Sequence, residues 1–343
     1  MQTMTLNTLK PGLKKSGLFS RWGRTFAAGA VLALTASAAS AAQAYPDRPI
    51  TMVVPFAPGG SSDTIARIIA PKLGEVLGQT IVMENVSGAG GMLGTQKAVR
   101  SNPDGYTVLL GSGSEILINK LINPSVAYDG LTDLAPVVFV GTGPMVLVGK
   151  TDLPAKTMPE LLALARAKPG SLSYASAGNG TPMHVAGELL KMRAGISMTH
   201  IPYRGAAPAL IDIMGGQVDL GVSTLTAAQP HIRSGKIKAF GVTSAKPSEL
   251  APDLPALGQS PELKGFDLGV WFGLFVPVKT PADVAAKIQA AAQQVLNDPA
   301  IRERLAKQGI SASGASAEEL KKFMDNEVVK YSEVVKAANI TAQ

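Results

Sequence analysis

The sequence predicts an α/β protein of two lobes, each built around a doubly wound sheet. From residue 45 onward, short β-rich runs alternate with helical patterns, an order typical of parallel strands joined by helices. Many of these runs are apolar throughout, as expected for strands that are covered on both faces. The same order of elements occurs over 50–141 and again over 172–244, which indicates two lobes of ordinary domain size.

The individual elements follow from the periodicity of the apolar residues. The predicted strands are 50–56, 80–86, 106–111, 135–141, 145–150, 172–176, 198–203, 219–223, 237–244 and 270–277. The predicted helices are 64–77, 157–168, 183–194, 206–215 and 227–234. Two long amphipathic stretches, 281–309 and 316–338, follow, and we expect them to pack on the outside of a sheet.

Helix starts and chain crossings are marked in the sequence. Thr157, Thr280 and Ser316 are each followed three positions later by an acid, so we expect them to cap helices. Pro71 falls within the first predicted helix, close to a glycine, and should kink or shorten that helix. The run 141–150 and the apolar run around Trp271 are the natural places for the chain to pass between the lobes.

The first 44 residues have the pattern of a cleaved secretory signal peptide. A basic start without acidic residues is followed by the apolar run 26–36 and by small residues that end in "AQA". A retained membrane anchor is the alternative, but the apolar run is shorter than the roughly 20 residues that span a bilayer. The sequence therefore predicts export to the periplasm.

Charge and composition exclude several classes of function. The whole chain carries a formal charge of +7, and five of the basic residues lie in the predicted signal, which leaves +2 over 45–343. With no basic stripe left, we expect no nucleic-acid partner. The chain has no cysteine, which excludes thiol nucleophiles, thiolate metal sites and disulfides. We expect no metal and no cofactor.

Two strand–helix turns are candidates for binding an anion. The first lies within "VVPFAPGGSSDTIAR" (53–67), and the second lies within "YASAGNGTPMH" (174–184). A helix N-terminus presents backbone N–H groups without internal partners, and glycine lets a ligand approach them. Ligands of open parallel sheets bind beyond the carboxyl ends of the strands, where both turns lie. Ordinary helix capping is the alternative for either turn.

Particular side chains of these turns are the expected contacts. In the first turn they are Gly60, Ser61 and Ser62, and in the second Ser176, Gly178, Asn179 and Thr181. Facing each other across a cleft, the two turns could bind both ends of a small dicarboxylate. We expect Asp63 to cap its own helix, because a carboxylate would repel an anionic ligand.

Other loops would line the same cleft. The stretch "NVSGAGGMLG" (85–94) is one residue off the spacing of a dinucleotide-binding loop, and we interpret it as a flexible wall. "LLGSGSE" (109–115) offers Ser112 at the end of another strand. His184 could line the cleft or pack against the sheet. The Trp271–Phe272 pair could face the ligand or fill the space between the lobes.

Enzyme signatures are missing from the sequence. Its three histidines form neither an H-E-x-x-H pair nor an i, i+4 pair, and no G-x-S-x-G motif occurs. We therefore expect no enzyme, with an exported hydrolase or lyase as a remote alternative.

Several stretches together resemble one known family. "YPDRPITMVVPFAPGGSSDTIAR", "GAGGMLG", "PDGYTVLLG", "LSYASAGNGTPMHVAGE", "IPYRGAAPALIDIMGGQVDL" and "WFGLFVP" resemble the Bug-type, TctC-like substrate-binding receptors of tripartite tricarboxylate transporters, over 46–340. The resemblance implies a two-lobe periplasmic-binding-protein fold (type II Venus flytrap), each lobe with a doubly wound mixed sheet. We expect lobe one to comprise 45–145 and 267–343, and lobe two 146–266.

The resemblance also implies a ligand, contacts and partners. It implies capture of a small carboxylate between the lobes and integral-membrane permease subunits as partners. The residues it implies as contacts are Phe56, Ala57, Gly60 and Ser61 in lobe one and Ser176, Gly178, Asn179 and Thr181 in lobe two. We expect the protein to act as a monomer.

The chain departs from the family pattern at two places. Val86 and Ser87 stand where the family often has an arginine and a proline. Ser223, another expected contact, and Thr224 stand where an acid is common, which disfavours a ligand that carries an amine. We therefore expect a dicarboxylate or an aromatic acid, delivered to a permease. A sensor that presents the ligand to a membrane signalling receptor is the alternative.

Overall fold

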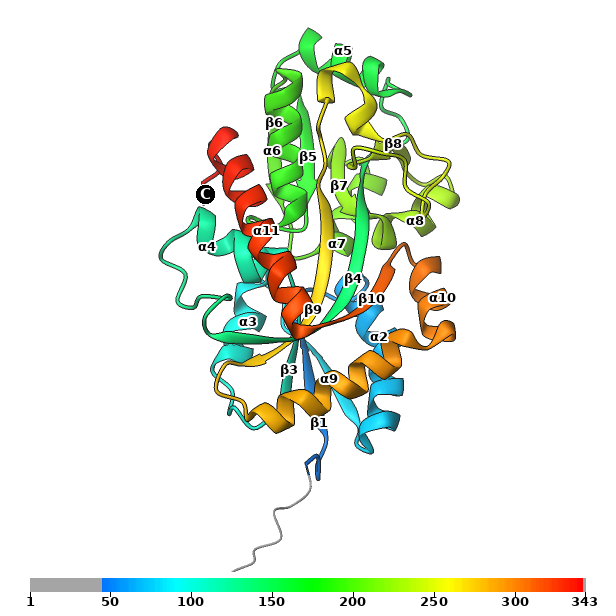
Figure 1. Ribbon diagram of the computed structural model, residues 1–343. Helices are drawn as coiled ribbons and strands as arrows, with labels where there is room; N and C mark the ends of the chain where they lie inside the picture. Colours follow the sequence, from blue (N-terminus) through cyan, green and yellow to red (C-terminus); the bar gives the residue numbers. More distant parts are fainter. Residues whose placement is uncertain (1–44, 342–343) are drawn as a thin grey trace, which may run out of the picture. The chain divides into compact units, whose positions relative to one another are not determined.

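The computed structural model describes residues 45–341. The signal peptide predicted over 1–44 lies outside the described residues. Figure 1 shows the elements from Pro46 onward in two groups, a lower and an upper one, joined by long strands.

The lower group is built on a mixed sheet. β1 (Ile50–Val54) lies between β2 (Ile81–Asn85) and β3 (Thr107–Ser112) and pairs with both in parallel. β3 pairs antiparallel with β9 (Gly269–Pro277), which in turn pairs antiparallel with the first part of β4 (Leu134–Gly149). The helical elements that follow these strands along the chain are α2 (Ser61–Leu77), the 3-10 helix η1 (Ala89–Gly91), α3 (Met92–Val99), the π-helix η2 (Ser114–Ile118), α4 (Asn119–Ile122), α9 (Ala282–Asn297), α10 (Pro299–Lys307) and α11 (Ala317–Ala337).

The upper group is a second mixed sheet. β5 (Leu172–Ser176) pairs in parallel with β6 (Met198–Pro202) and with β7 (Leu220–Thr224). The last part of β4 pairs antiparallel with β7 and, on its other side, with β8 (Lys238–Val242). The helices here are α5 (Met158–Ala167), α6 (Pro182–Ala194), α7 (Ala206–Met214) and α8 (Leu225–Arg233), with two 3-10 turns at η3 (Leu257–Gln259) and η4 (Pro261–Leu263).

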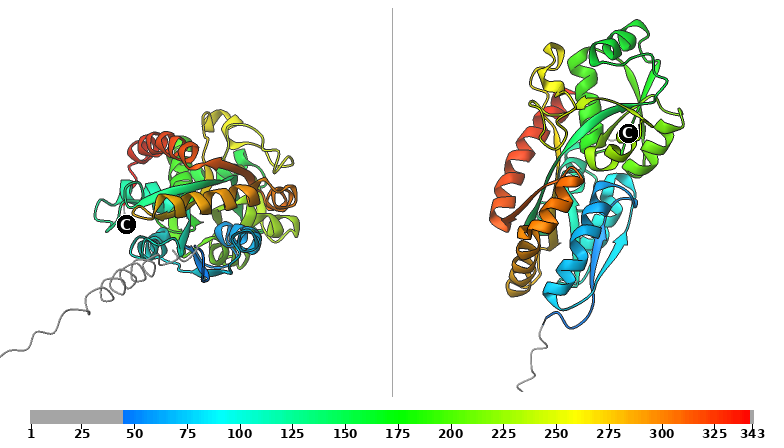
Figure 2. Two further views of the ribbon diagram at one scale, coloured as in Figure 1. Left: turned by 60° about the horizontal axis from the view of Figure 1, so that its bottom comes forward. Right: turned by 90° about the vertical axis from the view of Figure 1, so that its right-hand side faces the viewer.

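One strand belongs to both sheets. β4 pairs with β9 as far as Pro144 and with β7 from Met145 onward. β9 runs beside it, and α11 packs against both β4 and α6. Both views in Figure 2 show α11, in red, on the outside of the body. The two halves are therefore joined by continuous strands and by one long helix.

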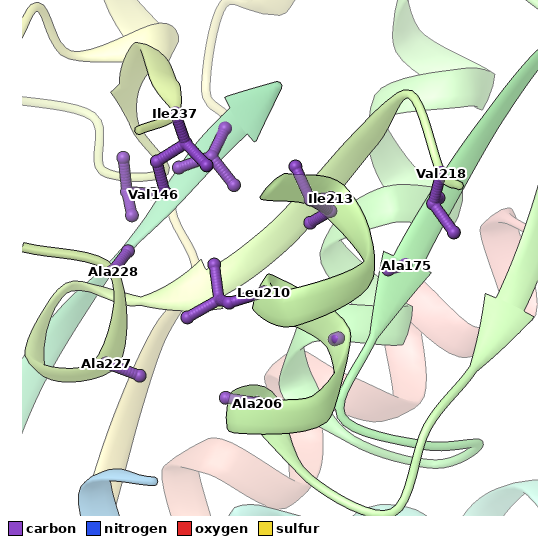
Figure 3. Packing of buried hydrophobic residues seen from close by; sticks show 11 residues of the cluster. Val146, Ala175, Ala206, Leu210, Ile213, Val218, Ala227, Ala228 and Ile237 are labelled. Atoms are coloured by element: carbon purple, nitrogen blue, oxygen red, sulfur yellow. The ribbon is translucent and has the colours of Figure 1, made fainter. Parts of the chain in front are cut away.

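The core of the upper half fixes α7 on its sheet. Leu210 and Ile213 project from α7 toward Val146 of β4 and Ile237, as Figure 3 shows, and all four are buried. Replacing such a buried leucine with alanine typically costs about 2–5 kcal/mol. This packing places the N-terminus of α7 at the boundary between the halves.

The predicted fold class is confirmed, and the elements differ from prediction in few places. The strands predicted at 135–141 and 145–150 form the single strand β4. β10 (Ser311–Ser316), which pairs with β4, was not predicted. Pro71 does not shorten α2; the residue is exposed, so the backbone carbonyl that its ring leaves without a partner can bind water.

The three predicted caps have different outcomes. Thr157 accepts a hydrogen bond from the N–H of Glu160, and Ser316 forms a full capping box with Glu319. The predicted cap at Thr280 is wrong, because α9 begins after Pro281. The Thr280 hydroxyl is buried without a partner among the described residues.

Candidate functional site

A small cavity lies between the two halves, beyond the carboxyl ends of β1, β3 and β5. The space open to the centres of water molecules is about 30 Å³. No charged side chain of the described residues lines it. The wall consists of Phe56, Gly60, Ser61, Ser62, Ser112 and Ser114 from the lower half, Ala177, Thr181, Pro182, Met183 and Ala206 from the upper half, and Val270 and Phe272 from β9.

Larger hollows exist elsewhere on the protein, but they do not lie at the carboxyl ends of the parallel strands. A hollow of about 690 Å³ runs along α2 and β2 and is bordered by Arg67 and Glu75, both engaged in ion pairs. Another, of about 540 Å³, runs along β9 and α11. Neither lies at the carboxyl ends of the parallel strands, where sheets of this kind bind ligands.

The N-terminus of α2 opens into the cavity without a cap. α2 begins at Ser61, and its N-cap residue Gly60 provides no side-chain hydrogen bond. The backbone N–H groups of Ser61 and Ser62, and both hydroxyls, have no hydrogen-bond partner within residues 45–341. Free N–H groups at a helix N-terminus attract an anion. Four donors of this turn are therefore available to a ligand.

Asp63 belongs to this turn but is bound to other groups. Its carboxylate accepts hydrogen bonds from the Gly59 N–H at 3.0 Å and from the Arg67 guanidinium at 2.9 Å. Burial raises the pKa of Asp63, but the bonds from Arg67 and Gly59 outweigh this and keep the pKa below its ordinary value. Its negative charge is thus paired with Arg67 and does not border the cavity. It secures the preceding loop rather than the first turn of its helix.

The turn before α6 satisfies its own backbone. Ser176 Oγ accepts from the Gly178 N–H at 3.1 Å, and His184 Nδ1 accepts from the Gly180 N–H at 3.3 Å. Thr181 Oγ1 accepts from the His184 N–H and donates to the Gly178 carbonyl. Pro182, the first residue of α6, has no N–H. Most donors of this turn are therefore occupied.

The free donors of the upper half lie instead at α7. This helix begins at Ala206 after Gly205, which provides no side-chain cap. The N–H groups of Ala206 and Ala207 have no partner within the described chain. A Cβ added to Gly59 would lie 3.3 Å from the Cβ of Ala207, so the loop before α2 meets the start of α7. The N-termini of α2 and α7 therefore form the opposed pair.

A stack of aromatic rings supports the α6 turn from behind. The rings of His184 and His200 stack with centroids 4.2 Å apart, and His200 stacks in turn on Tyr174. His200 Nε2 lies 2.7 Å from Ser176 Oγ. Burial lowers the pKa of His184 and lowers that of His200 to about 3. Both imidazoles are therefore neutral near pH 7 and act within the turn, not in the cavity.

The lower and upper halves are in close contact beside the cavity. A Cβ on Gly90 of η1 would lie 2.2 Å from the carbonyl oxygen of Asn179, so only glycine fits there. Ser114 Oγ donates to the Gly180 carbonyl at 3.2 Å, again from one half to the other. The two halves thus touch closely beside the cavity, at the turn before α6, which is consistent with its small volume.

The predicted site residues fall into two groups. The cavity wall includes Phe56, Gly60, Ser61, Ser62, Ser112 and Thr181. Six predicted residues lie outside the wall. Ala57 packs beside Gly205, and Ser223 has a buried hydroxyl without a partner among the described residues. The other four, all in the turn before α6, are Ser176, Gly178, Asn179 and His184.

Sequence reasoning missed part of the wall. Ala206 and Met183 carry no chemical signal, although Ala206 follows a strand and a glycine as Ser61 does. Phe272 lines the cavity, whereas its neighbour Trp271 borders the groove along α11, as the alternation of a strand requires. Glu115, buried behind Ser112, was also missed.

This architecture is that of a two-lobe binding protein, with a small cavity between the lobes. Residues 65–340 match the model of the tripartite tricarboxylate transporter family receptor, TctC. The chain belongs to this family of periplasmic solute-binding proteins.

Three solved structures show the same fold. The periplasmic binding protein BugD is 36% identical, with a TM-score of 0.81 over 87% of this chain and 100% of its own. Rpa4515 of R. palustris, solved with adipate, is 30% identical, with a TM-score of 0.84 over 87% and 99%. MatC from Rhodopseudomonas palustris, with bound malate, is 32% identical, with a TM-score of 0.81 over 85% and 100%.

The described residues contain neither a membrane-spanning helix nor a metal-binding cluster. No helix within 45–341 is long and apolar enough to span a membrane. No cluster of three histidine, aspartate or glutamate side chains in that part of the chain is arranged to bind a metal ion.

Proposed function

We propose that the protein captures a small dicarboxylate in the cavity between its lobes and delivers it to a membrane permease. The observation that carries this proposal is the uncapped N-terminus of α2, with the free hydroxyls of Ser61 and Ser62, in a cavity without charged side chains. Carboxylates at a helix N-terminus are typically stabilised by about 0.3–1 kcal/mol, and by up to about 2 kcal/mol where partly buried.

The opposed helices suggest how a dicarboxylate would lie. One carboxylate would accept hydrogen bonds from the N–H groups of Ser61 and Ser62 at α2. The other end would meet the N–H groups of Ala206 and Ala207 at α7 or the hydroxyl of Thr181. The similar structures with adipate and malate support a ligand with two carboxylates.

The small volume implies that capture involves a more open form. A space of about 30 Å³ corresponds to roughly one or two water molecules, which is too little for malate. The lobes would open by bending β4 and β9 where β4 changes partners, between Pro144 and Met145. This change of partners supports lobe boundaries at 45–145 with 267–343, and 146–266. Transfer to a permease after export is supported by the family alone.

Calorimetry with a panel of solutes tests this function. We expect malate, succinate and adipate to bind, and benzoate and aspartate to bind more weakly or not at all. Ser62→Asp places a negative charge at the N-terminus of α2 and should weaken malate binding at least about 100-fold, about 2.7 kcal/mol. The exposed Ser171→Asp is the matched control and should bind as the wild type does. Absence of heat with every dicarboxylate would refute the proposal.

A further inference from the structure

One buried acid lies directly behind the cavity wall. Glu115, in η2, is 1% exposed. Its Oε1 accepts a hydrogen bond from the Ser112 N–H at 2.5 Å, and its Oε2 lies 2.9 Å from Ser112 Oγ. Apart from the backbone N–H of Glu115 itself, the partner of this carboxyl is Ser112, which lines the cavity. A Cβ added to Gly91 would lie 3.1 Å from Glu115 Oε2 and 3.1 Å from the Phe56 ring, so this carboxyl lies near Phe56, another residue of the cavity wall, without lining the cavity itself.

No cation neutralises this carboxyl within the described chain. η2 packs against β3, η1, α4 and α11, and β3 and η1 contain no ionisable side chain. On α4, Lys120 donates to the carbonyls of Pro124 and Val126. On α11, the buried Glu327 pairs with Lys330. The Tyr128 hydroxyl donates to the Glu115 backbone carbonyl. Burial, and secondarily the negative charge of Glu115, raises the pKa of Tyr128, so this hydroxyl stays neutral.

Burial without a cation makes the neutral acid the stable form near pH 7. Desolvation raises the pKa of Glu115 to about 8, against the lowering effect of the hydrogen bonds from its own backbone N–H and from Ser112. Glu115 therefore gains or loses a proton close to neutral pH.

The protonation state of Glu115 decides which way the Ser112 hydroxyl donates. An ionised carboxylate only accepts, so the single proton of Ser112 Oγ must point to Oε2 and the cavity faces oxygen lone pairs. A protonated carboxyl can donate its own proton to Ser112 Oγ. The proton of Ser112 is then free to point into the cavity, where it can donate to a bound carboxylate.

We propose that Glu115 and Ser112 form a proton-dependent donor switch, so that the receptor takes up a carboxylate together with a proton on Glu115. The switch rests on the proposed function, and it makes Glu115 a positioning residue that acts through Ser112. It adds a second requirement for capture, because the solute must arrive while Glu115 is protonated.

The switch predicts a definite dependence of affinity on pH. If only the protonated form binds tightly, the apparent Kd is the intrinsic Kd divided by the protonated fraction. Affinity is then nearly constant below the pKa and falls about tenfold between about pH 7 and pH 9. Carboxyls of ordinary solutes are already ionised throughout this range, so the solute itself contributes no slope.

Calorimetric titration of malate and adipate between about pH 6 and 9 tests the switch. The wild type should lose about tenfold in affinity and should take up a proton on binding near pH 8, measured by repeating the titration in buffers of different ionisation enthalpy. Glu115→Gln keeps an amide that donates permanently to Ser112 Oγ, so its affinity should be independent of pH. Glu327→Gln, at another buried acid, is the matched control and should retain the wild-type slope.

Two further measurements keep the test decisive. Ser112→Ala removes the donor and should abolish the slope even if Glu115→Gln folds poorly, which thermal melting would show. In the protein without solute, infrared spectra should contain the band of a protonated carboxylic acid near pH 7 that disappears near pH 9. A wild-type affinity independent of pH, or the absence of that band, overturns the switch. Failure of malate and adipate to bind at every pH, with the band present, refutes the proposed function instead.

Discussion

The turns before α2 and α6 have the same plan in the sequence and opposite chemistry in the structure. Each places glycines and hydroxyl side chains between a strand and a helix. At α2 the hydroxyls of Ser61 and Ser62 are free and face the cavity, whereas at α6 those of Ser176 and Thr181 bind their own backbone. A pattern of glycine and serine therefore indicates a strained turn, and only the packing around it decides whether its donors are free.

The largest expected effect comes from preventing η1 from meeting the turn before α6. Gly90→Ala would place a Cβ 2.2 Å from the Asn179 carbonyl, which the closed form cannot accommodate. If this overpacking costs the closed form about 1–3 kcal/mol, malate affinity should fall by up to about 100-fold in calorimetry.

Gly195→Ala is the control for this variant. Gly195 has the same positive φ of 61°, but nothing lies within 4 Å of the added Cβ. It should lose stability without losing affinity. Equal loss of affinity in both variants would show that backbone strain causes the loss, and not the contact between η1 and the turn before α6.

The histidine stack behind the turn before α6 should make the stability of the protein depend on pH. Because the pKa of His200 is about 3 in the folded protein and near 6.5 when unfolded, the unfolded chain binds the proton more tightly. His200 therefore lowers stability as the pH falls from about 6.5 toward 3. In chemical denaturation, His200→Gln should gain on the order of 3 kcal/mol relative to the wild type between about pH 6.5 and 4.

Two alanine variants, one in each turn, should give the smallest effects, one mainly on stability and the other mainly on malate binding. Thr181→Ala removes a helix cap and should cost about 1 kcal/mol of unfolding free energy. Ser61→Ala removes a free hydroxyl and should leave stability within about 0.5 kcal/mol while weakening malate binding several-fold. Denaturant melts and calorimetry on both proteins measure this. A larger stability loss for Ser61→Ala than for Thr181→Ala would reverse the comparison.

Apolar periodicity was sufficient to predict most of the fold. It missed β10, whose sequence "SASGAS" has no apolar alternation because the strand pairs only at an edge. It divided β4 in two, because Gly141, Gly143 and Pro144 interrupt the apolar run although the backbone continues through them.

The candidate site was less accessible to prediction. Turn chemistry identified Ser61, Ser62 and Thr181, since glycine and hydroxyl residues follow strands there. Ala206 was missed because its contribution is a backbone N–H group, which every residue but proline possesses. Glu115 was missed because its burial depends on how η2 folds back behind β3, which no local pattern reveals.

The wall of the cavity contains no cationic side chain, and this affects the molecule as a whole. A captured dianion would enter the fold with both charges uncompensated. Residues 45–343 carry a formal charge of +2 with Glu115 counted as ionised. With Glu115 protonated, the empty receptor would carry +3 and the receptor filled with a dianion +1. The two forms should elute separately from a cation-exchange column, and a membrane partner with an acidic face could tell them apart at a distance.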